Sequence, residues 1–553
     1  MHKDGVALAV GLQIQATLSA LLKTLLTRLK TTLSTQGPVA EQLDSVQVVS
    51  YELAFITAEL HAMRAMLEYA QACETQGDAA LETSMALVFA ADVIPKIRYR
   101  FEKIRHAVQL TSVEYLATFE QPVVLEFCAC FNDPQALEQV GRAILTAGNC
   151  GRALLPEDKQ IIAASFARVA TEIVMPRAEA IHREDLTVPD EILSAIAEMG
   201  CFALSVPERF GGTAPDGGHD NLSMVVVTEE LSRGSLAAAG SPLTRPEIVT
   251  RALLAGGDEI QMARWLPEIA RGNPLCAIAV TEPDCGSDVA AVRLRAVPVA
   301  GGWCLNGAKT WCTFAGKATL LLVLARTDPD PAAGHRGLSL FLLEKPPTDE
   351  KSFAVDLPGG GVLSGKAIPT LGYRGMHSYT LFFDNVFIPA DNLVGGSSAA
   401  GKGFYLTMAG FAGGRLQTAA RACGLMRAAF DAAARYAGER RVFGRKLADY
   451  QLTLAKLAVL GTSLRACQQM TYHVAALMDA GAGQMEASLV KLYACRAAEQ
   501  LTREALQIHG GMGYSEETSV SRYFVDARVL SIFEGAEETL ALKVVARDLI
   551  LNA

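Results

Sequence analysis

The chain has 553 residues, half of them hydrophobic and a fifth charged, which excludes a disordered protein and implies three or four domains. Its formal net charge of −9 argues against a nucleic-acid partner, because phosphate binding requires clustered Lys and Arg side chains. The 12 cysteines are scattered, and the closest pair, Cys128 and Cys130, has no Cys or His cluster nearby. We therefore expect no metal site and free thiols in a reducing cytoplasm.

The first 150 residues are predicted to be almost wholly helical. Apolar residues recur at helical spacing over Val46–Ala72 and Ala79–Ile94. Pro95 is expected to end or kink the second helix, before a further helical run over 96–107. The apolar run Val6–Leu22 contains several polar residues, which favours an amphipathic helix packed on protein over a membrane span.

The rest of the chain changes character twice. Residues 155–275 are predicted to be helical, and residues 400–553 are helical again. Between them, residues 276–392 hold short β-prone runs separated by turns, which predicts a small antiparallel β domain. The expected strands are Cys276–Val280, Trp303–Leu305, Thr319–Ala325, Leu338–Leu343 and Thr380–Phe383. With 1–150 as a fourth domain, the fold class is α+β, mainly α, ending in a four-helix bundle.

The helices predicted within 51–91 also share a pattern with those predicted within 451–494. This pattern has two interpretations. The N-terminal region is either a degenerate copy of part of the C-terminal bundle or an unrelated antiparallel pair, since such pairs share this pattern.

Two segments of the β region combine hydroxyls, an indole and tight turns. The loop over 280–288 follows a probable strand and suits a phosphate or a polar ring edge, because it offers hydroxyls and backbone N–H groups. Trp311 and Thr313 lie two residues apart near a strand edge, so we expect both on one face, where they could pack and hydrogen-bond a flat ring. Either segment alone is also compatible with an ordinary turn or a core Trp.

Three segments of the C-terminal region carry the remaining signals. A basic stretch over 436–444 is followed by Gln451, and a di-glycine follows the helix that ends near Gln507. Two glycines there would let a backbone approach a ligand closely. Glu534 stands between apolar Ile532–Phe533 and Gly535, so we expect it to be partly desolvated, which raises the pKa of a carboxyl and makes it a usable base. A surface Glu is the alternative.

Taken together, in this order and at these separations, the five segments resemble the acyl-CoA dehydrogenase family over about residues 155–553. The resemblance implies FAD as cofactor and Glu534 as the base that removes the α-proton of an acyl-CoA while a hydride leaves for flavin N5. It implies an electron-transfer flavoprotein as acceptor. The implied cofactor-binding residues are Ile278, Val280, Thr281, Ser287, Trp311, Thr313, Arg440, Phe443, Gln451, Gln507, Gly510, Gly511 and Glu538. Family members often carry Thr at the position of Ala536, which puts one flavin contact in doubt.

The resemblance also narrows the substrate. The helical extension and the segment 369–379 are similar to members that act on a short branched acyl-CoA with a free carboxylate. The implied substrate-binding residues are Ser287, Arg415, Gly535, Arg245 and Arg374, with His377 as a further alternative for the carboxylate. The extension further suggests a homodimer rather than a tetramer. Another short-chain acyl-CoA, an oxidase, or a non-catalytic flavin- or DNA-binding relative are the competing hypotheses.

Overall fold

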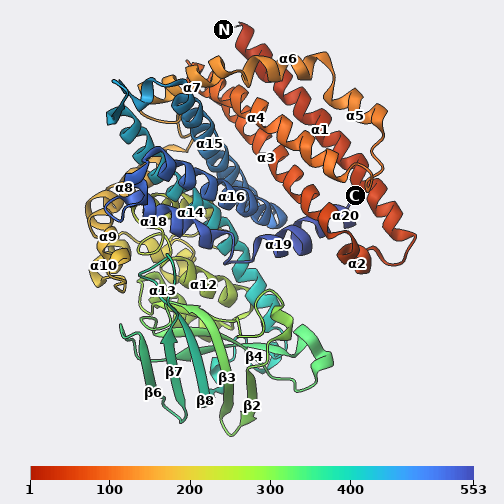
Figure 1. Cartoon of the computed structure of the whole chain (residues 1–553). Coiled ribbons are helices and arrows are strands. Elements are labelled where there is room, and N and C mark those ends of the chain that lie inside the picture. Colours follow the sequence, from red (N-terminus) through yellow and green to blue (C-terminus); the bar gives the residue numbers. More distant parts are fainter. Residues whose placement is uncertain (1) are drawn as a thin grey trace. The chain divides into compact units, whose positions relative to one another are not determined.

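The computed structural model describes residues 2–553, which divide into two compact units (Figure 1). The first unit combines the residues up to Gln160 with Thr418–Ala553, so it contains both ends of the chain. The second unit is Ile161–Gln417. Each unit is described in turn.

The first unit is entirely helical apart from a short hairpin. Its N-terminal helices are α1 (His2–Ser34), α2 (Val39–Gln42), α3 (Gln47–Thr75), α4 (Ala80–Ile104), α5 (Ser112–Phe119), α6 (Pro122–Phe131) and α7 (Pro134–Ala147). Its C-terminal helices are the second part of α14 (Gly403–Glu439), α15 (Gln451–Asp479), α16 (Gln484–Ile508), α17 (Gly511–Tyr514), α18 (Ser519–Leu530), α19 (Glu537–Thr539), a π-helix (Leu540–Ala546) and α20 (Arg547–Leu551). The prediction of a helical N-terminal region is confirmed.

The N-terminal helices pack directly on the C-terminal helices within this unit. The pair α3 and α4 contacts α15, and α3 also contacts α16. Helix α7 approaches α15 at backbone distance, because a Cβ on Gly141 would lie 2.1 Å from the carbonyl oxygen of Leu454. Helix α4 runs on through Pro95, so of the two alternatives, that Pro95 ends or kinks the helix, the first is wrong. Helix α4 contacts α1, α3, α6, α7 and α15, and these contacts support it although Pro95 removes one backbone hydrogen bond.

Helix α1 is the one segment of the described chain that is long and apolar enough to cross a membrane by length and composition, over Gly5–Ser34. One face of it is buried in protein, as predicted for an amphipathic helix, through contacts with α3 and α4. The buried apolar residues are Leu8, Ile14, Leu18, Leu22, Leu25, Leu26, Leu29 and Leu33. Together with the buried Gly11, they recur at intervals of three or four residues, apart from the adjacent pair Leu25 and Leu26, and this is the spacing of one helical face.

The second unit sets helices against a sheet. The helices are α8 (Glu157–Val169), a π-helix (Ala170–Val174), α9 (Met175–Arg183), α10 (Asp190–Glu198), α11 (Asn221–Gly234), α12 (Thr244–Gly256), α13 (Glu259–Ala270) and the first part of α14. The strands are β1 (Cys276–Ala279), β2 (Arg295–Val299), β3 (Gly302–Thr313), β4 (Leu320–Arg326), β5 (Leu338–Glu344), β6 (Ser352–Asp356), β7 (Val362–Ala367) and β8 (Ser378–Pro389). They run in the order β1-β4-β2-β3-β8-β7-β6, with β5 also paired to β4.

Strand β4 shows how the sheet is buried on both faces. Leu320, Leu322 and Leu324 pack in one core with residues of α12 and α13, whereas Leu321 and Val323 pack in a second core with residues of β3 and β8. Successive side chains of a strand point to opposite faces, so a strand covered on both faces appears as a continuous apolar run.

Two expectations about the sheet are corrected. The sheet is mixed rather than wholly antiparallel, because β1 pairs parallel with β4, and Arg295 of β2 also pairs parallel with Arg326. Strands β2, β6 and β7 were not predicted. Strand β2 is exposed at four of its five residues, β6 is exposed at every second residue, and β7 contains Gly365 and Lys366. None of the three has an apolar run that distinguishes it from a loop.

Candidate active site

The predicted base, Glu534, lies in the turn between α18 and α19 of the first unit. Its φ is +54°, in the left-handed region that non-glycine residues adopt only when their surroundings impose it. Gly535 follows at φ +95°, and a Cβ there would lie 2.8 Å from Leu540. The turn therefore requires glycine after the glutamate, and it holds Glu534 in an uncommon conformation.

Buried cations fix the peptides on both sides of Glu534. The Nζ of Lys491 on α16 donates to the carbonyl of Phe533 at 2.7 Å and also to the carbonyl of Gly535. The guanidinium of Arg421 on α14 lies 4.7 Å from the centre of the Phe533 ring. Both cations are buried. Neither was predicted as a site residue, because a single cation inside a helical pattern looks like an ordinary surface residue.

The reactive groups of Glu534 itself are available. Among the residues that the structure describes, its carboxylate has no hydrogen-bond or ion-pair partner, and its N–H donates to no carbonyl. The residue is half-buried, with Phe533 half-buried before it and Ile532 54% exposed. The expected apolar surroundings are therefore formed on one side only, by Phe533.

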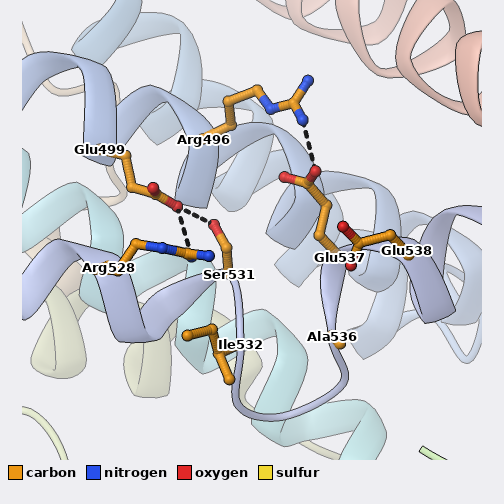
Figure 2. A pocket seen from close by; sticks show the side chains of 8 residues that line it. All are labelled: Arg496, Glu499, Arg528, Ser531, Ile532, Ala536, Glu537 and Glu538. Carbon is orange, nitrogen blue, oxygen red and sulfur yellow. Dashed lines mark hydrogen bonds and ion pairs between the residues drawn. The ribbon is translucent and has the colours of Figure 1, made fainter.

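A cavity of 310 Å³ lies beside this turn, within the first unit. Figure 2 shows the side chains that line it: Arg496 and Glu499 from α16, Arg528 from α18, Ser531, Ile532 and Ala536 from the turn, and Glu537 and Glu538 from α19. Glu538, a predicted flavin contact, is exposed here. Arg496 pairs with Glu537 at 2.5 Å, whereas Glu499 accepts from Ser531 and pairs with Arg528 at 3.4 Å. Each end of the turn is thus tied to α16.

The predicted flavin-facing residues of the second unit lie on two adjoining segments. Trp311 has φ +57° and is 55% exposed, at a bulge where the register between β3 and β8 shifts. The regular alternation used to place Trp311 and Thr313 on one face therefore does not hold. Thr313 is half-buried, and its hydroxyl lies 2.9 Å from that of Ser378. A bulge re-aims side chains at a sheet edge, and here it exposes the indole.

A buried ion pair joins this bulge to the loop after β1. Lys309 donates to the carbonyl of Val280 and to Glu282, each at 2.8 Å, and the N–H of Thr310 donates to the carbonyl of Thr281 at 2.8 Å. Burial lowers the pKa of Lys309, and the attraction of Glu282 opposes that shift. The structure thus brings Val280 and Thr281 beside the Trp311 strand, through two residues that were not predicted.

The remaining residues of this group differ in exposure. The side chain of Val280 is buried, so its backbone is what it can offer a ligand. Ile278 is half-buried in β1, and Ser287 is exposed in the following loop. A large exposed indole beside a loop of hydroxyls and backbone amides fits a flat ring with a polar edge.

The predicted cofactor residues of the first unit lie on two exposed segments. The first is the hairpin of β9 (Arg441–Val442) and β10 (Arg445–Lys446), where Arg440 is exposed and Phe443 is 97% exposed at φ +48°. Exposed cations and an aromatic ring suit a phosphate and a base. Gln451, in contrast, donates to Glu138 of α7 at 3.1 Å, so the N-terminal region already binds the side chain expected to meet the cofactor.

The second segment follows α16. Gln507 is exposed, and a Cβ on Gly510, whose φ is +59°, or on Gly511 would meet nothing within 4 Å. His509 anchors this loop: it stacks on Tyr436 at 4.3 Å, and its Nδ1 lies 2.8 Å from a backbone carbonyl of α16. Burial lowers the pKa of His509. His509 thus holds the loop, and the two glycines leave open space beside its backbone, as close approach of a ligand requires.

The candidates for substrate contact separate clearly. Arg245, in the first turn of α12, is 5% exposed, and its Nη1 donates to Tyr373 and to the carbonyl of Ser241, each at 3.2 Å. Among the described residues it pairs with no carboxylate. A buried guanidinium with unused donors next to a helix N-terminus suits an anion.

Arg374 and His377, in contrast, already have partners within the protein. Arg374 donates to the carbonyls of His182 and Thr370, and His377 lies 3.1 Å from Asp185. Burial alone would raise the pKa of Asp185, but hydrogen bonds from Lys351 and His377 lower it overall. The segment 369–379 is therefore anchored to the end of α9 by these two residues.

Arg415 lies half-buried on α14, two residues after Gly413, which closely approaches the Glu247–Arg251 ion pair of α12. A Cβ on Gly413 would lie 2.5 Å from both partners of that pair. The glycine therefore sets how closely the helix that carries Arg415 approaches the helix that carries Arg245.

Comparison with known proteins gives a consistent result. Residues 156–273, 277–386 and 401–550 match the models of the acyl-CoA dehydrogenase N-terminal, middle and C-terminal domains. The (2S)-methylsuccinyl-CoA dehydrogenase of Cereibacter sphaeroides is 37% identical over 96% of both chains. The caffeyl-CoA reductase-Etf complex subunit CarC of Acetobacterium woodii is 34% identical over 63% of this chain and 87% of its own.

Among solved structures, a glutaryl-CoA dehydrogenase of Mycobacterium smegmatis in complex with FADH2 is similar, with a TM-score of 0.62. It is 26% identical and covers 72% of this chain and 95% of its own. The chain belongs to the acyl-CoA dehydrogenase family of oxidoreductases, which act on CH–CH bonds.

Proposed function

We propose that the chain is an FAD-dependent dehydrogenase that oxidises (2S)-methylsuccinyl-CoA to mesaconyl-CoA. The observation that carries the substrate assignment is Arg245, which is buried and, among the described residues, pairs with no carboxylate. A buried charge without a counter-charge is costly, so the free carboxylate of a dicarboxylic acyl-CoA would complete the site. The similarity to a methylsuccinyl-CoA dehydrogenase over 96% of the chain, including the N-terminal region, supports the same substrate.

Glu534 is the proposed base. Its free carboxylate can accept the proton from the carbon next to the thioester carbonyl. Its N–H, free of any described partner, can donate to the thioester oxygen as negative charge develops there. Lys491 holds the carbonyls on either side of Glu534, so both groups keep their geometry during the reaction.

FAD, when bound, supplies the hydride acceptor for the β-hydrogen. In the second unit, Trp311 and Thr313 would hold its ring, and the loop from Val280 to Ser287 its polar edge. In the first unit, the exposed hairpin with Arg440 and Phe443 would reach the FAD of a neighbouring subunit, and the Gln507–Gly511 loop and Glu538 are further cofactor contacts. Gln451 contributes to this site only by exchanging its bond with Glu138.

An electron-transfer flavoprotein is the proposed electron acceptor, and a homodimer is the proposed assembly. A relative named as part of an Etf complex supports the acceptor. The dimer is supported by α3 and α4, which cover α15 and α16 within one chain and leave that face unavailable to another. Light scattering on the purified protein tests the assembly, with a mass of twice 58.9 kDa expected.

The decisive experiment is anaerobic reduction of the bound flavin, followed by its visible absorbance. Methylsuccinyl-, succinyl-, glutaryl-, isobutyryl- and butyryl-CoA are mixed with wild type, Glu534→Gln and Arg245→Met. Methylsuccinyl-CoA is expected to reduce wild type fastest. Glu534→Gln should lower this rate by about 10³- to 10⁴-fold, as expected for loss of a general base, with flavin content unchanged.

Arg245→Met is expected to lower kcat/KM for methylsuccinyl-CoA by about 100-fold, because a charge-assisted bidentate contact with the substrate carboxylate is lost. Butyryl-CoA, which has no second carboxylate, is the matched control and should lose less than about threefold. Equal losses for both substrates, or fastest reduction by butyryl- or isobutyryl-CoA, would overturn the substrate assignment. Protein that purifies without flavin and binds none would overturn the whole proposal.

A further inference from the structure

The N-terminal helices bind the segment that follows the proposed base. Residues 537–553 begin three positions after Glu534 and run to the end of the chain. Lys30 of α1 donates to the carbonyls of Leu551 and Ala553 at 2.8 and 2.9 Å. Asp44 pairs with Lys543 at 2.5 Å, in an exposed contact. The third contact is made by Tyr51 of α3 to Glu537, which is nearer to Glu534 in sequence than the other two contacted segments.

Tyr51 forms a closed group with Arg496 and Glu537. Its hydroxyl donates to the carboxylate of Glu537 at 2.5 Å, and Nη2 of Arg496 lies 2.5 Å from both the hydroxyl and the same carboxylate oxygen. The side chain of Glu537 is 13% exposed. Burial, together with the hydrogen bond to Glu537, raises the pKa of Tyr51 to about 12, so the hydroxyl remains a donor at neutral pH.

Further contacts hold Arg496 and helix α3, on which Tyr51 lies. The guanidinium of Arg496 stacks at 4.0 Å on the ring of Phe55, one turn along α3, and Arg100 of α4 stacks on the same ring at 4.9 Å. Arg100 is in turn paired with Glu52 at 2.7 Å and Glu59 at 2.9 Å, which are both buried. Tyr51 is therefore carried by a helix whose own position is fixed by buried charges.

Glu537 transmits this position to the catalytic turn. Its N–H donates to the carbonyl of Ser531 at 3.0 Å and closes the turn around Glu534. Figure 2 shows Glu537 at the point where the turn ends, with its carboxylate directed toward Arg496. Lys491 fixes the two carbonyls next to Glu534, whereas Glu537 fixes the end of the turn that leads into α19.

We infer that Tyr51 of the N-terminal region is a positioning residue for Glu534, acting through Glu537 and Arg496. The inference rests on the proposed role of Glu534 as base. It assigns the N-terminal helices a part in the reaction itself, besides their packing. A positioning residue acts on the reaction step rather than on substrate affinity, so its loss should lower kcat and leave KM nearly unchanged.

The test compares Tyr51→Phe, Glu537→Gln and the double variant, each as the full-length flavin-loaded protein. Tyr99→Phe is the matched control: the same hydroxyl is removed from an N-terminal helix where the side chain is 67% exposed. Tyr51→Phe is expected to lower the rate of flavin reduction by roughly fivefold to tenfold, since small misplacements of a catalytic group have effects of this size or larger. In the Glu537→Gln background the same change should cost less than about twofold.

Hydrogen exchange provides a second readout that needs no substrate. Peptides spanning 531–540 should exchange faster in Tyr51→Phe than in wild type or Tyr99→Phe, while peptides from α15 stay unchanged. Wild-type rates and exchange in Tyr51→Phe, or equal rate losses in both Glu537 backgrounds, would overturn the inference. If Glu534→Gln keeps wild-type activity, the proposed base is wrong instead, and the exchange measurement still reports whether Tyr51 holds the turn.

Discussion

The exposed edge around Trp311 and the turn around Glu534 are both held in place by a buried lysine, but the other residues that hold them come from different parts of the chain. In each, a residue in the left-handed conformation lies near a buried lysine that donates to at least one backbone carbonyl. Lys309 also pairs with Glu282, 27 residues away, so the sheet edge is fixed inside one domain by its own ion pair.

The bonds of Lys491 to the catalytic turn go to the carbonyls of Phe533 and Gly535. The far end of that turn is held by Glu537, whose partner Tyr51 is 486 residues away. The platform proposed for the flavin ring is thus locally determined, whereas the base depends on a remote part of the chain. The following changes test this difference.

The largest effect is expected at the ion pair of the sheet edge. Lys309→Met should lower the free energy of unfolding by about 3–5 kcal/mol, because the buried carboxylate of Glu282 loses its counter-charge. The double variant Lys309→Met/Glu282→Gln should recover a large part of that loss. Urea denaturation of both variants measures the difference, and equal losses would show that the pair is not the fixing element.

A smaller and different effect is expected at the catalytic turn. Lys491→Met should lower the rate of flavin reduction by about 30- to 100-fold, because the peptides on both sides of Glu534 lose their common donor. Lys456→Met on α15 is the control, since that lysine is partly exposed and its pair with Glu504 contributes at most about 1 kcal/mol. Stopped-flow reduction distinguishes the two, and similar rates would contradict the role of Lys491.

The smallest effect concerns pH and the loop after α16. Burial lowers the pKa of His509 below its ordinary value. Between the two pKa values His509 is therefore protonated in the unfolded chain and neutral in the folded chain. The contribution of His509 to the free energy of unfolding is therefore fully present above pH about 6.5, and it is lost as the pH falls through the folded-state pKa.

His509→Phe keeps the ring on Tyr436 and removes the titration. It should flatten the decline of Tm and of flavin retention between pH 6.5 and 5, by less than about 1 kcal/mol at the acid end. A thermal melt series across this range is the measurement. An unchanged decline would place the acid sensitivity elsewhere.

Sequence patterns predicted the helical regions and five of the strands because each contains an unbroken apolar run or a clear helical period. They did not predict β2, β6 and β7, which have no such run, nor the parallel pairing of β1 with β4. They also left open that Pro95 ends its helix, which it does not; the contacts with other helices that support α4 are not visible in the local sequence.

For the site, the sequence by itself determined which residues carry reactive groups: Glu534 before its glycine, the indole of Trp311, and the glycines after Gln507. Their chemistry is a property of the side chains and their immediate neighbours in the chain. Only the tertiary structure decided which cations hold them. Lys309, Lys491 and Arg496 act through carbonyls and carboxylates that are distant in sequence, and nothing in the local pattern distinguishes them from solvated lysines and arginines. It also separated Arg245, without a carboxylate partner among the described residues, from Arg374, whose donors are used by backbone carbonyls, because only packing determines which acceptors a buried guanidinium meets.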